Sequence, residues 1–303
     1  MEFLLTIDIG GTYIKLALIS IRGQLVEKEE VSTPQSIDEF SDVIDEYYKR
    51  MNKNYSLIGI TISSPGSVTD TGHVLGYSAV PFVHEHNLKQ LLGKRYCLPV
   101  AMENDANCAA LSELWKGEAR GCETFACIVC GTGIGGAIII NKKLFKGANL
   151  HGGEFGYSIL ASDIHENVYE TWSELGSSSA ISRRLKHQAP YDDGWTGHMV
   201  FEQAGKNHEG AQKSLDSFFY TLAIGIFNIQ YILDPEKILV GGGITRQPDF
   251  LEELESRMDK ILDAKPIAKV RPSISLCHYL DEAQLVGAAY VWLEEYRKGD
   301  LHV

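Results

Sequence analysis

The sequence lacks the long apolar runs and the basic charge that mark several large protein classes. No apolar run approaches the roughly 20 residues of a membrane-spanning helix, and no signal-peptide pattern follows Met1 and Glu2. The formal net charge is -12, which disfavours general binding to nucleic acid or anionic membranes because both need a basic face. We therefore expect a cytoplasmic protein that binds neither nucleic acid nor membrane.

The sequence also lacks clustered cysteines. Its six cysteines are spread along the chain, mostly inside apolar segments. Cys127 and Cys130 form a Cys-x-x-Cys pair, but residues three apart in a strand point to opposite faces, so this pair is poorly placed to share a metal. Reduced thiols in the protein core are the better interpretation.

The 303 residues are 44% hydrophobic, which suffices for one large domain or two ordinary ones. A strand, a Gly/Thr turn and a second strand occur twice, at residues 7–18 and 129–140. This repetition indicates a degenerate internal duplication. We predict an N-terminal α/β domain over residues 1–117 and a C-terminal α/β domain over 118–303, with the last helix (about 283–303) packing back on the first domain.

Glycine turns at strand ends suit the phosphates of a nucleoside triphosphate, because glycine lets backbone amides approach phosphate oxygens closely. Thr12 and Thr132 add hydroxyl donors to two of these turns, and Asp8 would hold Mg²⁺ through water. Lys15 either adds positive charge or lies on a solvated strand face. A single such turn commonly only closes a hairpin, so the repetition is what favours nucleotide binding.

Asp105 lies where an apolar strand ends and a helical pattern begins, and that pattern ends near Gly117. A carboxylate beside the positive end of a helix dipole stays ionised and can accept a proton or hold a hydroxyl. The alternative is a helix cap, because Asn and Asp are preferred N-caps. This segment alone favours the cap, and a cap can still be a catalytic base.

Two polar stretches of the second half are open to more than one interpretation. His151 and Glu154 lie between glycines and could bind the hydroxyls of a polyhydroxylated ligand, or could belong to a surface turn. Residues 190–210 are polar and broken by Pro190, Gly194 and Gly197, which favours a loop region.

Taken together, the motifs resemble those of the ROK family (repressors, open reading frames and sugar kinases). The resemblance covers essentially the whole chain and implies an α/β, actin-like ATPase (ribonuclease H-like) fold with two duplicated α/β domains and an active site in the cleft between them. It also implies phosphorylation of a hexose, usually at the 6-hydroxyl, with ATP and Mg²⁺, and a homodimer. The motifs occur in order at Asp8-x-Gly10-Gly11-Thr12-x-x-Lys15, Pro65-Gly66, Glu103-Asn104-Asp105, Gly131-Thr132-Gly133-x-Gly135-Gly136, Gly153-Glu154-x-Gly156 and Gly241-Gly242-Gly243.

The resemblance also implies roles for individual residues. Asp105 resembles the catalytic base. The positions that resemble sugar ligands are Gly66, Asn104, Asp105, His151, Glu154 and Glu170, and those that resemble the nucleotide site are Asp8, Gly10, Gly11, Thr12, Lys15, Thr132, Gly133 and, on the adenosine side, Gly242.

One large departure from the family pattern concerns zinc. The family continues after Gly-Glu-x-Gly with a His and a Cys-rich cluster, whereas here Tyr157 replaces the His and residues 158–172 contain no cysteine. A structural zinc site needs four N or S ligands, so we predict no zinc. Tyr157 also alters the sugar pocket. A few zinc-lacking members act on β-glucosides, which makes that substrate class a candidate.

Two alternatives to a kinase remain. A sugar-responsive repressor of the same family would carry an N-terminal helix-turn-helix domain, but only seven residues precede Asp8 and the chain is acidic. A sugar sensor without catalysis is disfavoured by the intact Asp8 and Asp105. We therefore predict an ATP:sugar phosphotransferase.

Overall fold

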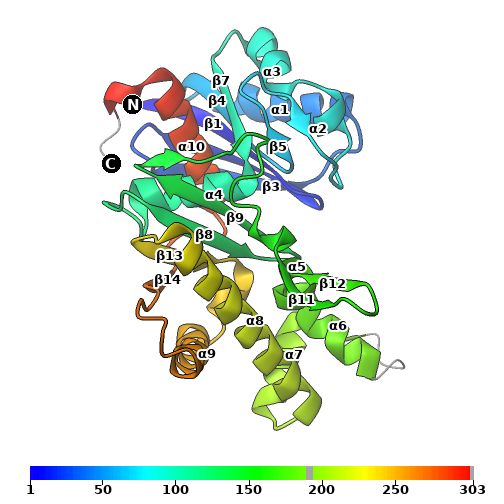
Figure 1. Ribbon diagram of the computed structural model, residues 1–303. Coiled ribbons are helices and arrows are strands. Elements are labelled where there is room, and N and C mark those ends of the chain that lie inside the picture. Colours follow the sequence, from blue (N-terminus) through cyan, green and yellow to red (C-terminus); the bar gives the residue numbers. More distant parts are fainter. Residues whose placement is uncertain (189–193, 301–303) are drawn as a thin grey trace. The chain divides into compact units, whose positions relative to one another are not determined.

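The computed structural model describes residues 1–188 and 194–300 (Figure 1). The backbone divides into two compact units. Unit 1 contains residues 1–121, 146–151 and 281–300, and unit 2 contains residues 122–145, 152–188 and 194–280. The segment 146–151 thus belongs to unit 1, although the chain before and after it belongs to unit 2.

Unit 1 is built on a five-stranded mixed sheet with the order β3-β2-β1-β4-β7. β1 is antiparallel to β2 and parallel to β4, and β4 is parallel to β7. A short hairpin of β5 and β6 follows β4. The bounds are β1 Glu2–Ile9, β2 Tyr13–Ser20, β3 Leu25–Ser32, β4 Ser56–Ser64, β5 Ser67–Val68, β6 Val74–Leu75 and β7 Val100–Asn104.

Helices cover both faces of this sheet. α1 and α3 pack their apolar side chains, such as Phe40 and Leu92, into a continuous core with β1 and β4. α4 and α10 pack against each other on the other face, where Thr61 Oγ1 of β4 donates to the carbonyl of Ala288 in α10 at 2.5 Å. The bounds are α1 Ile37–Met51, α2 Phe82–Glu85, α3 Leu88–Tyr96, α4 Asp105–Lys116, α10 Ala283–Tyr296 and η3 Lys298–Asp300.

Unit 2 repeats the same strand pattern in the order β10-β9-β8-β13-β14. β8 is antiparallel to β9 and parallel to β13, as β1 is to β2 and β4. This repetition agrees with the duplication that the two Gly/Thr turns predict. The bounds are β8 Phe125–Cys130, β9 Ile134–Ile140, β10 Lys143–Leu144, β11 Ile159–Asp163, β12 Val168–Thr171, β13 Lys237–Gly241 and β14 Ile274–Leu276.

The helices of unit 2 enclose an aromatic core in which Phe218 and Phe219 of α8 pack against Phe250 of α9. Among the described residues, no helix is both long and apolar enough to cross a membrane. The bounds are η1 Phe155–Tyr157, α5 Trp172–Gly176, α6 Ser178–Gln188, α7 Gly197–Gly205, α8 Glu209–Leu233, η2 Gly243–Arg246 and α9 Phe250–Ala264.

Two expectations need correction. The predicted loop at residues 190–210 contains helix α7, whose first turn is capped by the Thr196 side chain accepting from the Met199 amide; Pro190 lies outside the described residues. The prediction of core thiols holds for Cys108, Cys127 and Cys130, whereas Cys97 is exposed. Cys97 follows the last helical residue of α3 in a left-handed conformation at the surface, which its sequence context did not indicate.

Candidate active site

Polar side chains of unit 1 form a row across the carboxyl ends of its parallel strands. The register aligns Asp8 of β1 with Ser63 of β4, and Ser63 with Glu103 of β7. Because neighbouring strands lie about 4.8 Å apart, the backbones of Asp8 and Glu103 are separated by roughly 10 Å. Ser63 lies two residues after Thr61, so it points toward the same face, which α4 and α10 cover.

Asp8 is a buried carboxylate with few partners of opposite charge. Its Oδ1 accepts from Ser63 Oγ at 2.8 Å, and its Oδ2 lies 3.5 Å from Lys15 Nζ. Burial raises the pKa of Asp8, and the positive charge of Lys15 opposes that rise. Lys15 therefore places a positive charge beside Asp8. One carboxylate beside a hydroxyl fits Mg²⁺ that is held largely through water.

The first glycine turn is held by Thr33, the residue that directly follows β3. The Gly10 amide donates to the Tyr13 carbonyl at 3.0 Å, and the Gly10 carbonyl accepts from Thr33 Oγ1 at 2.7 Å. The Thr33 amide donates to the Thr12 carbonyl at 3.0 Å. Gly11 and Thr12 remain exposed at the tip. Thr33 lies 21 residues after Thr12, and no local pattern indicates that it supports this turn.

Asn104, not Asp105, caps helix α4, so the expectation that Asp105 caps the helix is wrong. The Asn104 Oδ1 accepts from the amides of Ala106 and Asn107, at 2.9 and 3.1 Å. Its Nδ2 donates to the Gly66 carbonyl at 3.1 Å and to Asp105 Oδ1 at 2.9 Å. The amide side chain can serve both purposes because it carries an acceptor and a donor.

This arrangement brings together three of the predicted sugar-site residues, namely Gly66, Asn104 and Asp105. Asp105 is the first residue of α4, and its Oδ1 also accepts from the Ala106 amide at 2.8 Å. Gly66 has a φ of +88°, and a Cβ atom there would lie 2.7 Å from Val74 Cγ1. The turn after Pro65 therefore requires glycine, and its carbonyl is directed at Asn104.

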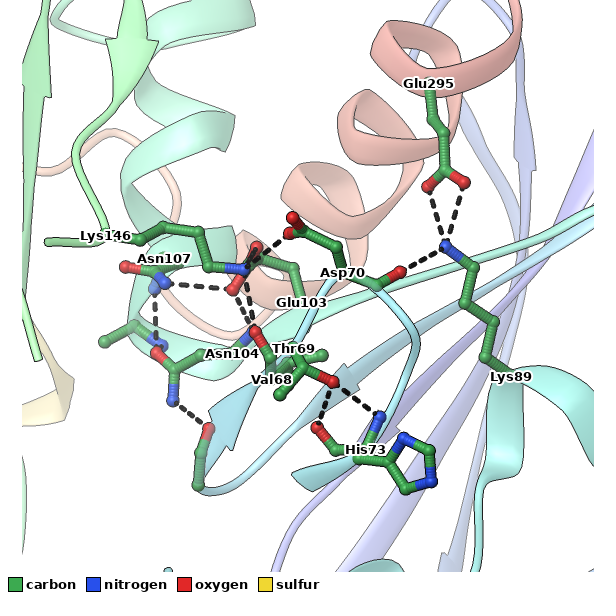
Figure 2. Close-up of polar contacts among 12 residues, drawn as sticks. Val68, Thr69, Asp70, His73, Lys89, Glu103, Asn104, Asn107, Lys146 and Glu295 are labelled. Carbon is green, nitrogen blue, oxygen red and sulfur yellow. Dashed lines mark hydrogen bonds and ion pairs between the residues drawn. The ribbon is translucent and has the colours of Figure 1, made fainter. Parts of the chain in front are cut away.

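Glu103 and Lys146 form an ion pair beside this group that the sequence analysis did not identify (Figure 2). Glu103 Oε1 accepts from the Asn104 amide at 2.7 Å and from Asn107 Nδ2 at 2.9 Å, while its Oε2 accepts from Lys146 Nζ at 3.0 Å. Lys146 also donates to the Val68 carbonyl at 2.8 Å. The sequence around Lys146, a single lysine before a glycine-rich loop, does not indicate that it pairs with Glu103.

The second glycine turn, in unit 2, is supported by serines at the start of α6. The Gly131 amide donates to the Gly133 carbonyl at 2.9 Å, and the Gly131 carbonyl accepts from the Ser178 amide at 2.9 Å. Ser179 Oγ donates to the Thr132 carbonyl at 2.6 Å. The turn thus lies at a helix N-terminus, which favours anions. The run of three serines at 177–179 was the sequence feature from which this support of the turn could have been predicted.

The third glycine turn lies directly against the second. Gly242 has a φ of +102°, and a Cβ atom there would lie 2.2 Å from the carbonyl oxygen of Cys130, the last residue of β8. Thr245 Oγ1 donates to the Gly242 carbonyl at 2.9 Å. Thr132, Gly133 and Gly242 are therefore gathered at one end of the unit 2 sheet.

A cavity of about 890 Å³ lies among α7, α8 and α9 of unit 2. Its lining combines apolar Phe201 and Phe219 with charged Asp216 and Arg257, and it includes Gln247, which directly follows η2. The volume falls within the usual range of small-molecule pockets. The sequence analysis did not identify this cavity, because its lining comes from separate helices.

The remaining predicted residues lie on turns and on a hairpin. In unit 1, His151 is exposed, with its Nδ1 2.7 Å from the Asn149 carbonyl. In unit 2, Glu154 is partly buried and directly precedes η1, whereas Tyr157 at the end of η1 is 73% exposed. Glu170 is exposed on β12, opposite Ala161 of β11. Gly66, Asn104 and Asp105 are joined by hydrogen bonds at the start of α4, whereas His151 lies on a turn and Glu170 on a hairpin.

Across residues 1–188 and 194–300, no group of three or more His, Cys, Asp or Glu side chains is arranged to hold a metal ion. The absence of zinc stays a prediction.

A model of the ROK family matches residues 4–295. The chain belongs to the ROK family. This membership confirms the resemblance that the ordered motifs indicated.

Several curated relatives are named as sugar kinases. A beta-glucoside kinase of Listeria monocytogenes is 31% identical over 95% of this chain and 96% of its own length. A ROK family protein of Streptococcus pneumoniae, solved in complex with sucrose, is 36% identical with a TM-score of 0.90 over 98% of this chain and 99% of its own.

A ROK family glucokinase of Streptomyces griseus, in complex with glucose and AMPPNP, is 25% identical with a TM-score of 0.77 over 95% of this chain and 98% of its own. These structures confirm the predicted actin-like ATPase fold class.

Proposed function

We propose that this chain is an ATP-dependent sugar kinase in which Asp105 is the catalytic base. The observation that carries the proposal is the cluster at the start of α4, where Asn104 bonds both the Gly66 carbonyl and the Asp105 carboxylate. Asp8 lies on the same carboxyl edge of the sheet, in the row with Ser63 and Glu103. Ligands of α/β sheets bind at this edge.

In this mechanism Asp105 accepts the proton of the sugar hydroxyl as its oxygen attacks the γ-phosphorus of ATP. The bond from Asn104 Nδ2 orients the carboxylate, since it holds Oδ1 at 2.9 Å. Asn104, Gly66, His151, Glu154 and Glu170 bind sugar hydroxyls. The oxygen that attacks is the 6-hydroxyl.

The phosphates of ATP bind the backbone amides and hydroxyls of two turns, at Gly10-Gly11-Thr12 and at Thr132-Gly133. Lys15 adds positive charge, and the N-terminus of α6 favours the same anions. Mg²⁺, when bound near Asp8 through water, would neutralise charge on the transferring phosphoryl group. The adenosine lies on the side of Gly242, and the 890 Å³ cavity, whose lining includes Gln247, is of a suitable size.

The substrate class within this proposal is a hexose or a β-glucoside. Its support is the name of the Listeria relative and the exposed Tyr157 at the position where zinc-containing members carry His. The protein is further proposed to act in the cytoplasm as a homodimer. Sedimentation velocity at several concentrations measures the oligomeric state.

A coupled ADP-release screen tests the proposed function. The wild-type protein is assayed with ATP, Mg²⁺ and, in separate wells, glucose, N-acetylglucosamine, N-acetylmannosamine, fructose, cellobiose and gentiobiose. Sugar-dependent ADP release that disappears in Asp105→Asn supports the proposal, and phosphorus NMR of the product identifies the hydroxyl. Equal release by wild type and Asp105→Asn would remove Asp105 from the role, and release with none of these sugars would contradict the kinase.

A further inference from the structure

The segment 146–151 is the part of unit 1 that is contributed by the middle of the chain. It leads directly into Gly152, Gly153 and Glu154, so its position sets where this proposed sugar loop begins. Within the segment, backbone bonding is slight: the Leu150 amide donates to the Gly147 carbonyl at 3.5 Å. The side chain of Lys146 makes two short hydrogen bonds from this segment to other parts of unit 1.

Figure 2 shows Lys146 reaching two elements of unit 1 at once. Its Nζ donates to the Val68 carbonyl of the β5–β6 hairpin at 2.8 Å and to Glu103 Oε2 at the end of β7 at 3.0 Å. The carboxylate of Asp70 is 3.9 Å away but 99% exposed, so solvent screens that pair.

Glu103 differs from a surface partner because its side chain is only 7% exposed. Its other oxygen, Oε1, accepts from the Asn104 amide and from Asn107 Nδ2. Asn104 in turn donates to Asp105 Oδ1. A continuous set of hydrogen bonds therefore runs from Lys146, through Glu103 and Asn104, to the carboxylate of Asp105.

We propose that Lys146 is a positioning residue, which fixes the start of the sugar loop relative to Asp105 through its ion pair with buried Glu103. The inference rests on the proposed kinase function and assigns no contact of Lys146 with the substrate. We expect substitution of Lys146 to weaken sugar binding, because the segment that Lys146 holds leads to His151 and Glu154. The turns proposed to bind ATP lie elsewhere in the chain and should be little affected.

The chain offers a matched control in Lys89. Its side chain is 20% exposed, against 22% for Lys146, and it forms an ion pair with Glu295 at 2.8 Å. It also donates to the backbone carbonyl of Asp70 at 3.5 Å, as Figure 2 shows. Lys89→Met therefore removes a comparable lysine near the same hairpin without touching Glu103.

Steady-state kinetics with the sugar that the screen identifies test the inference. In Lys146→Met we expect the sugar KM to rise about tenfold and the ATP KM to change less than twofold, with Lys89→Met unchanged in both. An active wild type in which Lys146→Met and Lys89→Met behave alike overturns the inference alone. A wild type that neither releases ADP nor binds any sugar overturns the proposed function, and the inference with it.

A second variant separates positioning from folding. Lys146→Met leaves the Glu103 carboxylate buried without its cation, which by itself lowers stability. The double variant Lys146→Met/Glu103→Gln removes that charge, so its thermal midpoint should recover toward wild type. A sugar KM that stays about tenfold high in the double variant supports positioning. Recovery of the sugar KM together with the midpoint would show that only stability was affected, and would overturn the inference.

Discussion

Asn104 has two separable tasks in the structure, and a pair of substitutions distinguishes them. Its Oδ1 caps α4 through the amides of Ala106 and Asn107, while its Nδ2 bonds Gly66 and Asp105. Serine caps a helix about as well as asparagine, but alanine cannot cap. Neither replacement restores the two bonds that the amide nitrogen donates.

The magnitudes follow from these contacts. Losing the cap in Asn104→Ala should lower the free energy of unfolding by about 1 kcal/mol, within a range of roughly 0.5–2 kcal/mol. That corresponds to a fall of about 2–4 °C in the thermal midpoint. Asn104→Ser keeps the cap, so it should be about 1 kcal/mol more stable than Asn104→Ala, although both variants lose the bonds that Nδ2 donates.

Both variants should lose function to a similar extent. A hydrogen bond to a charged group contributes about 1.5–3 kcal/mol, so loss of the bond to the Asp105 carboxylate should lower kcat/KM for the sugar by roughly 10- to 100-fold. Differential scanning fluorimetry and the coupled ADP assay measure the two quantities on the same samples. Wild-type kcat/KM in Asn104→Ser would refute the positioning of Asp105 by the amide, and equal destabilisation of both variants would refute the cap.

Three further outcomes are expected. In Gly287→Ala, a Cβ atom 1.7 Å from the carbonyl of Cys108 forces α10 away from α4, so urea denaturation should show a loss of at least 1–3 kcal/mol. Because burial raises the pKa of Asp8, its ionisation destabilises the fold above that pKa and the cost disappears as pH falls. As the pH is lowered, Asp8 should be protonated, and Mg²⁺ affinity lost, at a higher pH than for an ordinary aspartate. Calorimetry with Mg²⁺ and a non-hydrolysable ATP analogue measures this loss, and the pH dependence due to Asp8 should be absent in Asp8→Asn. Hydrogen bonds from Arg95 lower the pKa of Asp45, so this pair stabilises the fold above the ordinary value near 3.8 and the benefit is lost as pH falls below it. Arg95→Met should thus cost about 1 kcal/mol at pH 7 and progressively less as the pH falls from 3.8 toward the lowered pKa of Asp45, as urea unfolding at pH 7, 4 and 3 would report.

The sequence predicted the two strand–turn–strand repeats and the helices that begin at Asp105 and near residue 283, because their apolar periodicity is strong. The last helix, predicted over about 283–303, spans Ala283–Tyr296 in the structure. Helix α7 was missed because the glycines around it resemble a loop. Thr196, the N-cap of α7, was a local sign of a helix start, but the surrounding glycines and polar residues favoured a loop.

The residues of the site could be predicted where a local motif indicates their role. They could not be predicted where the role comes from a contact with a residue far along the chain. The glycine turns and the Asn104-Asp105 pair are local patterns, so they were found. The supports of those patterns, such as Thr33 behind Gly10 and Lys146 beside Glu103, come from 23 and 43 residues away. No rule of local spacing brings such pairs together, because only the folding of distant segments against each other does so.

The placement of α10 in unit 1 has a consequence for the order in which the protein is made. Leu285, Tyr290 and Trp292 of α10 are buried, and Trp292 Nε1 donates to the Pro99 carbonyl at 3.1 Å. During translation these residues leave the ribosome only after the whole of unit 2. Until α10 has been synthesised, one face of the unit 1 sheet is therefore incompletely covered, whereas unit 2 can already fold. Nascent chains halted before residue 281 should bind chaperones that recognise exposed apolar surface.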